Sequence, residues 1–209
     1  MRMPESENFF LRGLPFPSDA FYPAFGPATI EAHYGQICRA HLDALRILRA
    51  SYAELSSLTV REILMCRRLP RRDADAILWH AGALYAHELY FSSLAVSPGG
   101  YPQPRRELTK MLSRDIGSYA ELAYRLREAA EGVRGVGFVY LLLDTGGSLT
   151  IRSLKDYDLP TLSKERPLFC IDLWEHAYYA DHGAHPERAV DAFLSVLCWK
   201  TVEKRVYDK

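Results

Sequence analysis

The chain has 209 residues, of which 48% are hydrophobic and 25% are charged, so it can bury a substantial core without disulfide staples. Lys plus Arg and Asp plus Glu are equal at 26 each. The chain therefore has no net charge that would attract nucleic acid or an anionic membrane, and we expect neither as a partner.

The cysteines and the start of the chain indicate the compartment. The four cysteines are far apart and form no CxxC pair, which favours reduced thiols over a zinc ribbon or a dithiol redox motif. The opening residues MRMPESENFFLRGLPFP lack the apolar centre of a signal peptide. No run approaches the roughly 20 apolar residues of a membrane span. We therefore expect a cytoplasmic protein.

The first half of the chain predicts a pair of helices. After the proline-rich stretch LPFPSDAFYPAFGP, apolar residues recur at helical spacing from Ile30 to about Leu55, with Thr29 as a candidate cap. His41 is the one position that interrupts this stripe. A second helix begins at Asp73 and covers DADAILWHAGALYAHELYFSSL, and the PGGYPQP stretch ends it.

The second half predicts mixed structure. A short helix is expected over about 105–112, and Ser118 with Glu121 has the spacing of a capping box for a helix that reaches about Glu131. GFVYLLL, the turn DTGG and SLTIRSL predict a β-hairpin, and PLFCIDL predicts a third strand. One last helix opens at Pro186 and continues through ERAVDAFLSVLCWKTVEKRV.

These elements predict an α+β fold with two parts. Residues 1–97 form an N-terminal antiparallel helical hairpin domain. Residues 103–209 form a C-terminal α/β domain with a three-stranded antiparallel sheet and helices.

Four residues from separate parts of the chain carry ligand chemistry. Asp172 ends the third strand, and His176 follows four residues later in a short helix, so the two side chains converge. Such a pair suits iron, manganese or zinc, although alone it is more often a structural couple. His33 and His87 lie among apolar neighbours on the two paired helices, where a single histidine is usually an ordinary core residue. Taken together, the four side chains predict a metal site between the two lobes.

The other histidines and aromatic residues have simpler explanations. His80 lies seven residues before His87, so it faces the same side of the helix and either approaches the site or is an ordinary core or surface residue. His182 and His185 are expected at the surface. Phe138 and Trp174 fit positions of ordinary aromatic residues in the hydrophobic core.

The segments IEAHYG (30–35), HELYFSSL (87–94) and DLWEHAYYADH (172–182) together resemble the iron/manganese superoxide dismutase family. LPFPSDAFYPAF, DIGSYAELAYRLREAA, GVGFVYLLL and VDAFLSVLCWKTVEKR agree with it in order and spacing, so the resemblance covers nearly the whole chain. It implies a superoxide dismutase that turns superoxide into dioxygen and hydrogen peroxide at one iron or manganese ion per subunit. The ligands it implies are His33, His87, Asp172 and His176.

The chain departs from the family beside the metal. A glutamine is expected either four residues before the second ligand histidine or in the loop after the second strand, and these positions hold Ala83 and Tyr157. The expected tyrosine eight residues after the first ligand is His41, and the expected histidine four residues after that ligand is Ile37. The resemblance therefore places His41 and Tyr157 at the catalytic positions and implies altered activity.

The resemblance also implies a homodimer or a higher oligomer. Glu175 would cross a two-fold interface to hydrogen-bond a ligand histidine of the partner subunit, and Tyr179 would face the same interface. Tyr34, Phe138 and Trp174 are expected around the metal pocket or at this interface.

Two other functions remain open on the sequence. One is a metal-binding or scaffold protein of the same fold that does not dismutate superoxide and holds an ion such as zinc for structure. The other is metal-assisted hydrolysis, which is weaker because no general-base carboxylate accompanies the four ligands.

Overall fold

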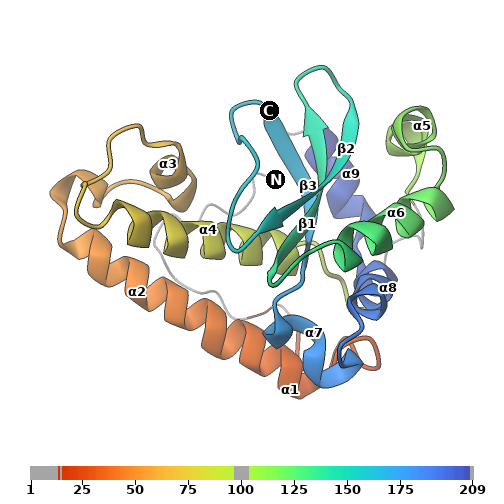
Figure 1. Cartoon of the computed structure of the whole chain (residues 1–209), viewed down its shortest axis with the longest axis horizontal. Helices are drawn as coiled ribbons and strands as arrows, with labels where there is room; N and C mark the ends of the chain where they lie inside the picture. The colour runs from red at the N-terminus through yellow and green to blue at the C-terminus, as the bar shows by residue number, and fades with distance from the viewer. Residues whose placement is uncertain (1–13, 15, 97–103, 208–209) are drawn as a thin grey trace.

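The computed structural model describes residues 14, 16–96 and 104–207 (Figure 1). Long helices from the first half of the chain lie against a three-stranded sheet, and the remaining helices surround the other end of that sheet. The predicted α+β class is confirmed. The predicted boundary between the domains, at residues 97–103, lies outside the described residues.

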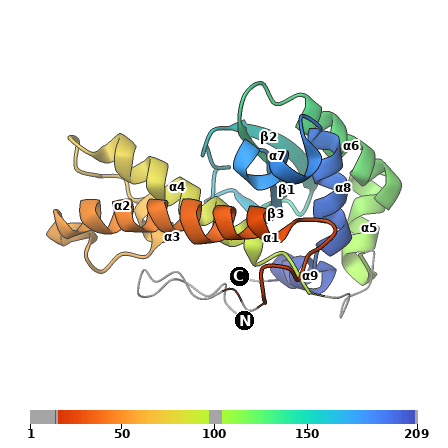
Figure 2. The ribbon, with the colours of Figure 1, turned by 90° about the horizontal axis from the view of Figure 1, so that it is seen from below.

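The first helix is a continuous rod with an irregular middle (Figure 2). It consists of α1 (Pro27–Ile30), the π-helical segment η1 (Glu31–Cys38) and α2 (Arg39–Ala50). The prediction that Thr29 caps this helix is wrong. Gly26 is the cap and Pro27 occupies the first turn, where its missing N–H costs nothing, so Thr29 is already inside the helix and buried.

The far end of the hairpin is more broken than predicted. The first helix stops at Ala50 instead of about Leu55, and a separate single turn, η2 (Ala53–Leu55), follows it. The next helix, α3 (Val60–Met65), was not predicted. It begins with a reciprocal capping box, in which Thr59 Oγ1 accepts from the Glu62 N–H at 3.2 Å and Glu62 Oε2 accepts from the Thr59 N–H at 2.8 Å.

The second long helix is confirmed. α4 (Ala74–Phe91) begins directly after Asp73, close to its predicted start, and runs antiparallel to α2 in Figure 1. The Tyr52 hydroxyl donates to Asp73 Oδ2 at 2.5 Å and ties the end of the first helix to the start of the second. α4 packs against both α2 and strand β3, which places it between α2 and the sheet.

The sheet follows the predicted order along the chain. The strands are β1 (Gly137–Asp144), β2 (Leu149–Lys155) and β3 (Glu165–Asp172), in the antiparallel order β2-β1-β3. Central strand β1 is buried along almost its whole length because neighbours cover it on every side. Its register pairs Phe138 with Asp172, so the end of β3 lies beside the start of β1.

Helices α5 (Arg106–Asp115) and α6 (Tyr119–Glu131) precede the sheet and pack against β2. The Ser118 hydroxyl accepts from the Glu121 N–H at 3.0 Å and forms one half of the predicted capping box. Helix α7 (Glu175–His182) follows β3 after a two-residue connection.

The prediction of a single last helix is wrong. The segment divides into α8 (Pro186–Val196) and α9 (Trp199–Tyr207), and Leu197 between them is extended, with ψ of 128°. The backbone after α4 pairs with this break, because the Ala95 N–H donates to the Val196 carbonyl at 3.0 Å. This long-range hydrogen bond replaces a helical hydrogen bond that the break removes.

The main hydrophobic cluster includes side chains from the N-terminal helices, the sheet and the C-terminal helices, so both halves of the chain share one core. A second cluster fills the far end of the helical hairpin. Within the described residues, every helix is too short or too polar to cross a bilayer.

Candidate metal centre

The structure brings the four predicted ligands together from four different elements. His33 lies on η1, His87 on α4, Asp172 at the end of β3 and His176 in the first turn of α7. One donor atom from each lies within 4.8 Å of the corresponding atoms of the other three. His33, His87 and Asp172 are buried, and His176 is partly buried. The site therefore forms where the helical hairpin meets the sheet.

Backbone groups hold two of the ligands in orientations suited to a cation. His87 Nδ1 lies 2.8 Å from the carbonyl oxygen of Ala83, one helical turn earlier. Because a carbonyl only accepts, Nδ1 carries the proton and the Nε2 lone pair is directed at the other ligands. Asp172 Oδ1 accepts from the Trp174 N–H at 2.8 Å, which leaves Oδ2 for the cluster.

The donor atoms surround an unsatisfied carboxylate oxygen. Asp172 Oδ2 lies 3.0 Å from His33 Nε2, 3.4 Å from His87 Nε2 and 3.5 Å from His176 Nε2. Neither Oδ2 nor His33 Nε2 forms a hydrogen bond within the described residues, although both atoms are buried. Bonds of about 2.1 Å to a shared ion separate neighbouring donors by about 3–3.5 Å. The orphaned atoms and their spacing therefore fit a metal ion.

The charges of the cluster also fit a cation. Burial lowers the pKa of His33 to about 4, even though the neighbouring Asp172 opposes this shift. Burial alone would raise the pKa of Asp172, but its three histidine neighbours lower it well below its ordinary value. At neutral pH, His33 is thus a neutral donor and Asp172 is an anion, as metal ligands must be.

Aromatic rings enclose the ligands. The Phe138 ring is fully buried, with its centre 6.1 Å from that of His87, and the Trp174 ring stacks on His176 at 5.8 Å. These contacts place Phe138 and Trp174 beside two of the predicted ligands. They keep bulk water from one side of the site and raise the effect of any charge within it.

Tyr34 reaches the site only indirectly. Its ring contacts Phe91 at 4.9 Å between centres, and Phe91 in turn contacts His33 at 4.7 Å. Partial burial raises the pKa of Tyr34 to about 12, so its hydroxyl stays protonated at neutral pH.

His41 and Tyr157, the two predicted catalytic residues, form one hydrogen-bonded chain with His80. His41 Nε2 lies 3.1 Å from the Tyr157 hydroxyl, and His41 Nδ1 lies 3.0 Å from His80 Nδ1. The Tyr157 ring is stacked on Trp174 at 4.6 Å and lies 5.8 Å from the ring of His87. Burial, followed by the neighbouring His87 and His80, lowers the pKa of His41 to about 3. Burial raises the pKa of Tyr157 above its ordinary value.

The sequence left the place of His80 open between the site and an ordinary core or surface role. Its spacing from His87 was the only available signal, and the structure resolves it in favour of contact with His41. The expectation that His182 is a surface residue is wrong in part. His182 is partly buried, and its Nε2 donates to the Ala24 carbonyl at 2.8 Å. His185 is exposed as expected.

The two predicted interface residues lie on the outside of the chain. Glu175 and Tyr179 are one helical turn apart on α7, both are exposed, and 52% of the Tyr179 surface is accessible. Such a large exposed aromatic side chain is available for a protein contact.

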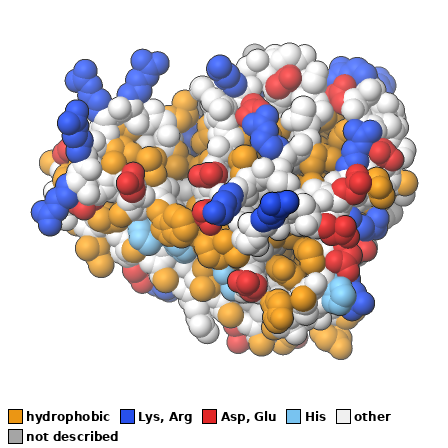
Figure 3. Space-filling model, in the orientation of Figure 1, with side chains coloured by type: hydrophobic (Ala, Val, Ile, Leu, Met, Phe, Trp, Pro, Cys, Tyr) orange, Lys and Arg blue, Asp and Glu red, His pale blue; other side chains and the backbone are white. Residues whose placement is uncertain are grey.

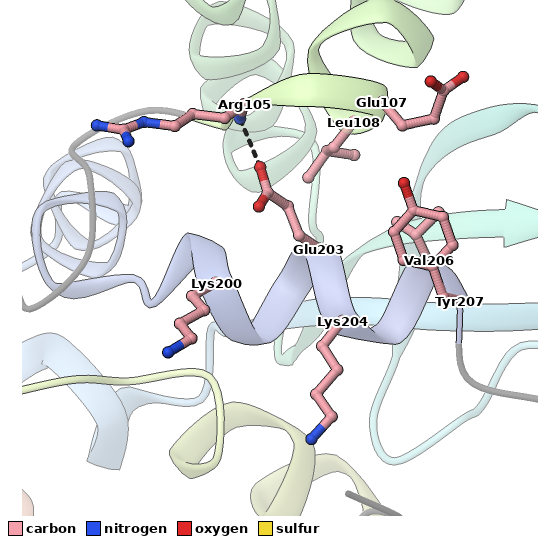
Figure 4. Close-up of a pocket in the computed structure, with 8 residues that line it drawn as sticks. All are labelled: Arg105, Glu107, Leu108, Lys200, Glu203, Lys204, Val206 and Tyr207. Carbon is pink, nitrogen blue, oxygen red and sulfur yellow. Dashed lines mark hydrogen bonds between the residues drawn. The ribbon is translucent and has the colours of Figure 1, made fainter.

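A separate surface pocket of about 470 Å³ lies between α5 and α9 (Figure 4). Glu203 extends across it and accepts from the backbone N–H of Arg105 at 2.5 Å. None of the four metal ligands lines this pocket, so the chemistry of the cluster is located elsewhere.

Comparisons with known proteins find several similar chains. Residues 104–205 match the family model described as iron/manganese superoxide dismutases, C-terminal domain. The chain is 30% identical over 197 residues to a manganese superoxide dismutase of Acinetobacter baylyi, covering 92% of this chain and 84% of the relative. It is 31% identical to a manganese superoxide dismutase of Thermus aquaticus, covering 94% and 96% of the two chains. An iron superoxide dismutase of Legionella pneumophila is 29% identical, with 92% and 95% covered.

Proposed function

The chain belongs to the iron/manganese superoxide dismutase family, and we propose that it disproportionates superoxide, converting two superoxide anions and two protons into dioxygen and hydrogen peroxide. Its cofactor is iron or manganese. The observation that carries the proposal is the convergence of three imidazoles and one carboxylate on buried, unsatisfied donor atoms. The relatives include iron and manganese enzymes at similar identity, so identity does not select the metal.

When bound, the ion supplies the one-electron oxidation and reduction that the reaction requires. The chain contributes the charge balance, because a single carboxylate among imidazole ligands leaves the site positive toward a small anion. The aromatic rings of Phe138 and Trp174 exclude bulk water and so strengthen this attraction.

The protons come through the chain's own polar groups. Hydrogen peroxide forms only if two protons reach the reduced oxygen. Tyr157 carries a hydroxyl group close to the site, because its ring lies beside that of ligand His87. Its raised pKa keeps it protonated at neutral pH, so it remains a hydrogen-bond donor. His41 holds the hydroxyl in place through the 3.1 Å bond.

The active assembly we propose is a homodimer that uses the exposed face of α7. Glu175 and Tyr179 lie on this face, and Glu175 directly precedes ligand His176 in the chain. A carboxylate from a neighbouring subunit could orient a ligand histidine there, as partners of metal-bound imidazoles commonly do. The mass of the purified protein in solution, compared with that of a Tyr179→Arg variant, tests this assembly. A wild-type monomer overturns it.

The alternative is a metal protein of the same fold that does not turn over superoxide. It is favoured by Ala83 and Tyr157, which stand where relatives are expected to carry a glutamine. The deciding experiment prepares iron, manganese and zinc forms separately, measures metal per chain and follows superoxide consumption by each. Turnover by the iron or manganese form and none by the zinc form supports dismutation. Stoichiometric metal without turnover in any form supports the alternative.

A matched pair of variants links activity to the cluster. His176→Gln removes one ligand, whereas His185→Gln changes an exposed histidine outside the cluster. We expect loss of metal and of superoxide consumption in the first variant only. Equal activity in both contradicts the proposed site.

A further inference from the structure

His80 is joined to the site by the contact between two Nδ1 atoms. It lies on α4, two turns before ligand His87, and is partly buried. Its Nδ1 lies 3.0 Å from Nδ1 of His41, whose other nitrogen contacts the Tyr157 hydroxyl. Figure 3 shows histidine side chains that reach the surface among hydrophobic ones, in the region occupied by α2 and α4 in Figure 1.

This geometry restricts where protons can lie. Two imidazole nitrogens at hydrogen-bond distance share one proton, because two lone pairs or two N–H groups facing each other repel. If His41 donates to His80, the remaining nitrogen of His41 is a lone pair and must accept from Tyr157. If His80 donates to His41, then His41 carries its proton on Nε2 and donates it to the Tyr157 oxygen.

The two arrangements give Tyr157 opposite roles. In the first, its only proton is committed to His41, and its oxygen can only accept on the side of His87. In the second, its oxygen accepts from His41, and its proton is free for an acceptor beside the metal ligands.

We propose that His80 is a positioning residue, which sets the tautomer of His41 and thereby decides whether the Tyr157 hydroxyl donates toward the metal ligands. The inference rests on the proposed dismutation for its effect on rate, but the tautomer itself is independent of that activity. His80 touches neither substrate nor metal and acts only through the two hydrogen bonds of the chain.

The engagement of both ring nitrogens of His41 is a second reason why residue 80 controls its tautomer. A neutral imidazole has one N–H and one lone pair. In water a neutral imidazole exchanges between its two tautomers freely, but here both nitrogens are engaged. The hydrogen-bond character of residue 80 therefore passes directly to Tyr157.

The test replaces His80 with side chains that can only accept or only donate. His80→Asp offers an ionised acceptor and is expected to place the proton of His41 on Nδ1. His80→Lys offers only donors and is expected to place it on Nε2. The readout is ¹⁵N NMR of the His41 ring in the diamagnetic zinc-loaded protein, because a protonated and an unprotonated ring nitrogen have well-separated shifts. The His41→Gln variant assigns the signal.

The rate provides the second readout. In the iron- or manganese-loaded protein, we expect superoxide consumption to be about tenfold higher in His80→Lys than in His80→Asp, the size of effect seen for groups one step from a metal ligand. Leu78→Asp and Leu78→Lys place the same charges on an exposed neighbouring position of α4 and should differ little from each other. In a His41→Phe background the difference between the two His80 variants should vanish.

The outcomes separate the two proposals. If His41 keeps the same tautomer in His80→Asp and His80→Lys, the positioning role is overturned. His80→Asn, which can donate or accept, serves as a neutral check and should fold even if the charged variants do not. In that variant a His41 tautomer that exchanges between both forms supports the role, and one fixed as in the wild type contradicts it. If the tautomer follows residue 80 but no metal form consumes superoxide, the positioning role stands and the proposed dismutation falls.

Discussion

Gly82 on α4 lies directly against the backbone of Tyr157. A Cβ atom at position 82 would be 2.7 Å from the Tyr157 carbonyl oxygen, closer than two such atoms can approach. The helix that carries His80 and His87 and the loop that carries Tyr157 therefore meet at a site where only glycine fits. This contact helps to hold the Tyr157 ring over His87.

Gly82→Ala should push the Tyr157 loop away from α4. We expect a loss of about 1–3 kcal/mol in the free energy of unfolding, because the clash is with backbone, and a lower rate of superoxide consumption as Tyr157 moves. Gly35→Ala is the matched control, since a Cβ there meets nothing within 4 Å and the residue is helical. That change should increase stability by about 0.5–1 kcal/mol. Urea unfolding of both variants checks the pair, and equal stabilities would show that the loop is not held at Gly82.

Tyr157→Phe should slow superoxide consumption while leaving metal content and stability nearly unchanged. The substitution removes the hydroxyl that contacts His41 at 3.1 Å and keeps the ring that stacks on Trp174. We expect a loss of about 10–100-fold in rate, as for other groups that act beside a metal ligand. Tyr124→Phe removes an exposed hydroxyl that donates to Glu128 at 2.9 Å and should have no effect. An unchanged rate in Tyr157→Phe would remove this hydroxyl from the reaction.

The sequence predicted the ligands because their signals are local. Asp172 and His176 lie in one short segment, and His33 and His87 each lie in a recognisable stretch of helix. The strands were predicted for the same reason, since alternation and turn residues act over a few positions. These local signals alone also fit structural histidines, so it was the resemblance to a known family that joined the four residues into one predicted ligand set.

The features that the sequence did not predict depend on contacts between distant segments. The π-helical turns around His33 have no local signature. The break at Leu197 exists because the backbone near Leu94 pairs with it, over a separation of about a hundred residues. The contact between His41 and His80 likewise depends on how α2 packs on α4. Periodicity gives the face of a helix, but it does not give the partner of each side chain.

The metal-free protein should lose stability as the pH falls from about 6.5 to 4. The folded-state pKa of His33 is about 4, below its ordinary value of 6.5, because burial disfavours the charged ring. Between these two values the unfolded chain binds a proton that the folded chain does not, so acid favours unfolding. For one fully buried histidine this amounts to at most about 1.4 kcal/mol per pH unit. Urea unfolding of metal-free protein across this range measures the slope.

His33→Gln should show a shallower dependence on pH over the same range, because the titrating ring is gone. His185→Gln, at an exposed position, should keep the slope of the wild type. A slope that His33→Gln leaves unchanged would mean that other groups govern the acid sensitivity of the fold.

Asp172→Asn should remove most of the increase in the free energy of unfolding that added metal gives the wild type. Asp172 supplies the only carboxylate of the cluster, and its Oδ2 lies within 3.5 Å of an imidazole nitrogen from each of the three ligand histidines. In the wild type, metal at about 100 times its dissociation constant should add about 2.7 kcal/mol to the free energy of unfolding. The neutral amide removes the negative charge, so affinity falls and the same metal concentration should add little. Asp43→Asn changes an exposed carboxylate away from the cluster and should retain the full gain. Thermal unfolding with and without manganese compares the three proteins, and a full metal-dependent gain in Asp172→Asn would show that the ion is held elsewhere.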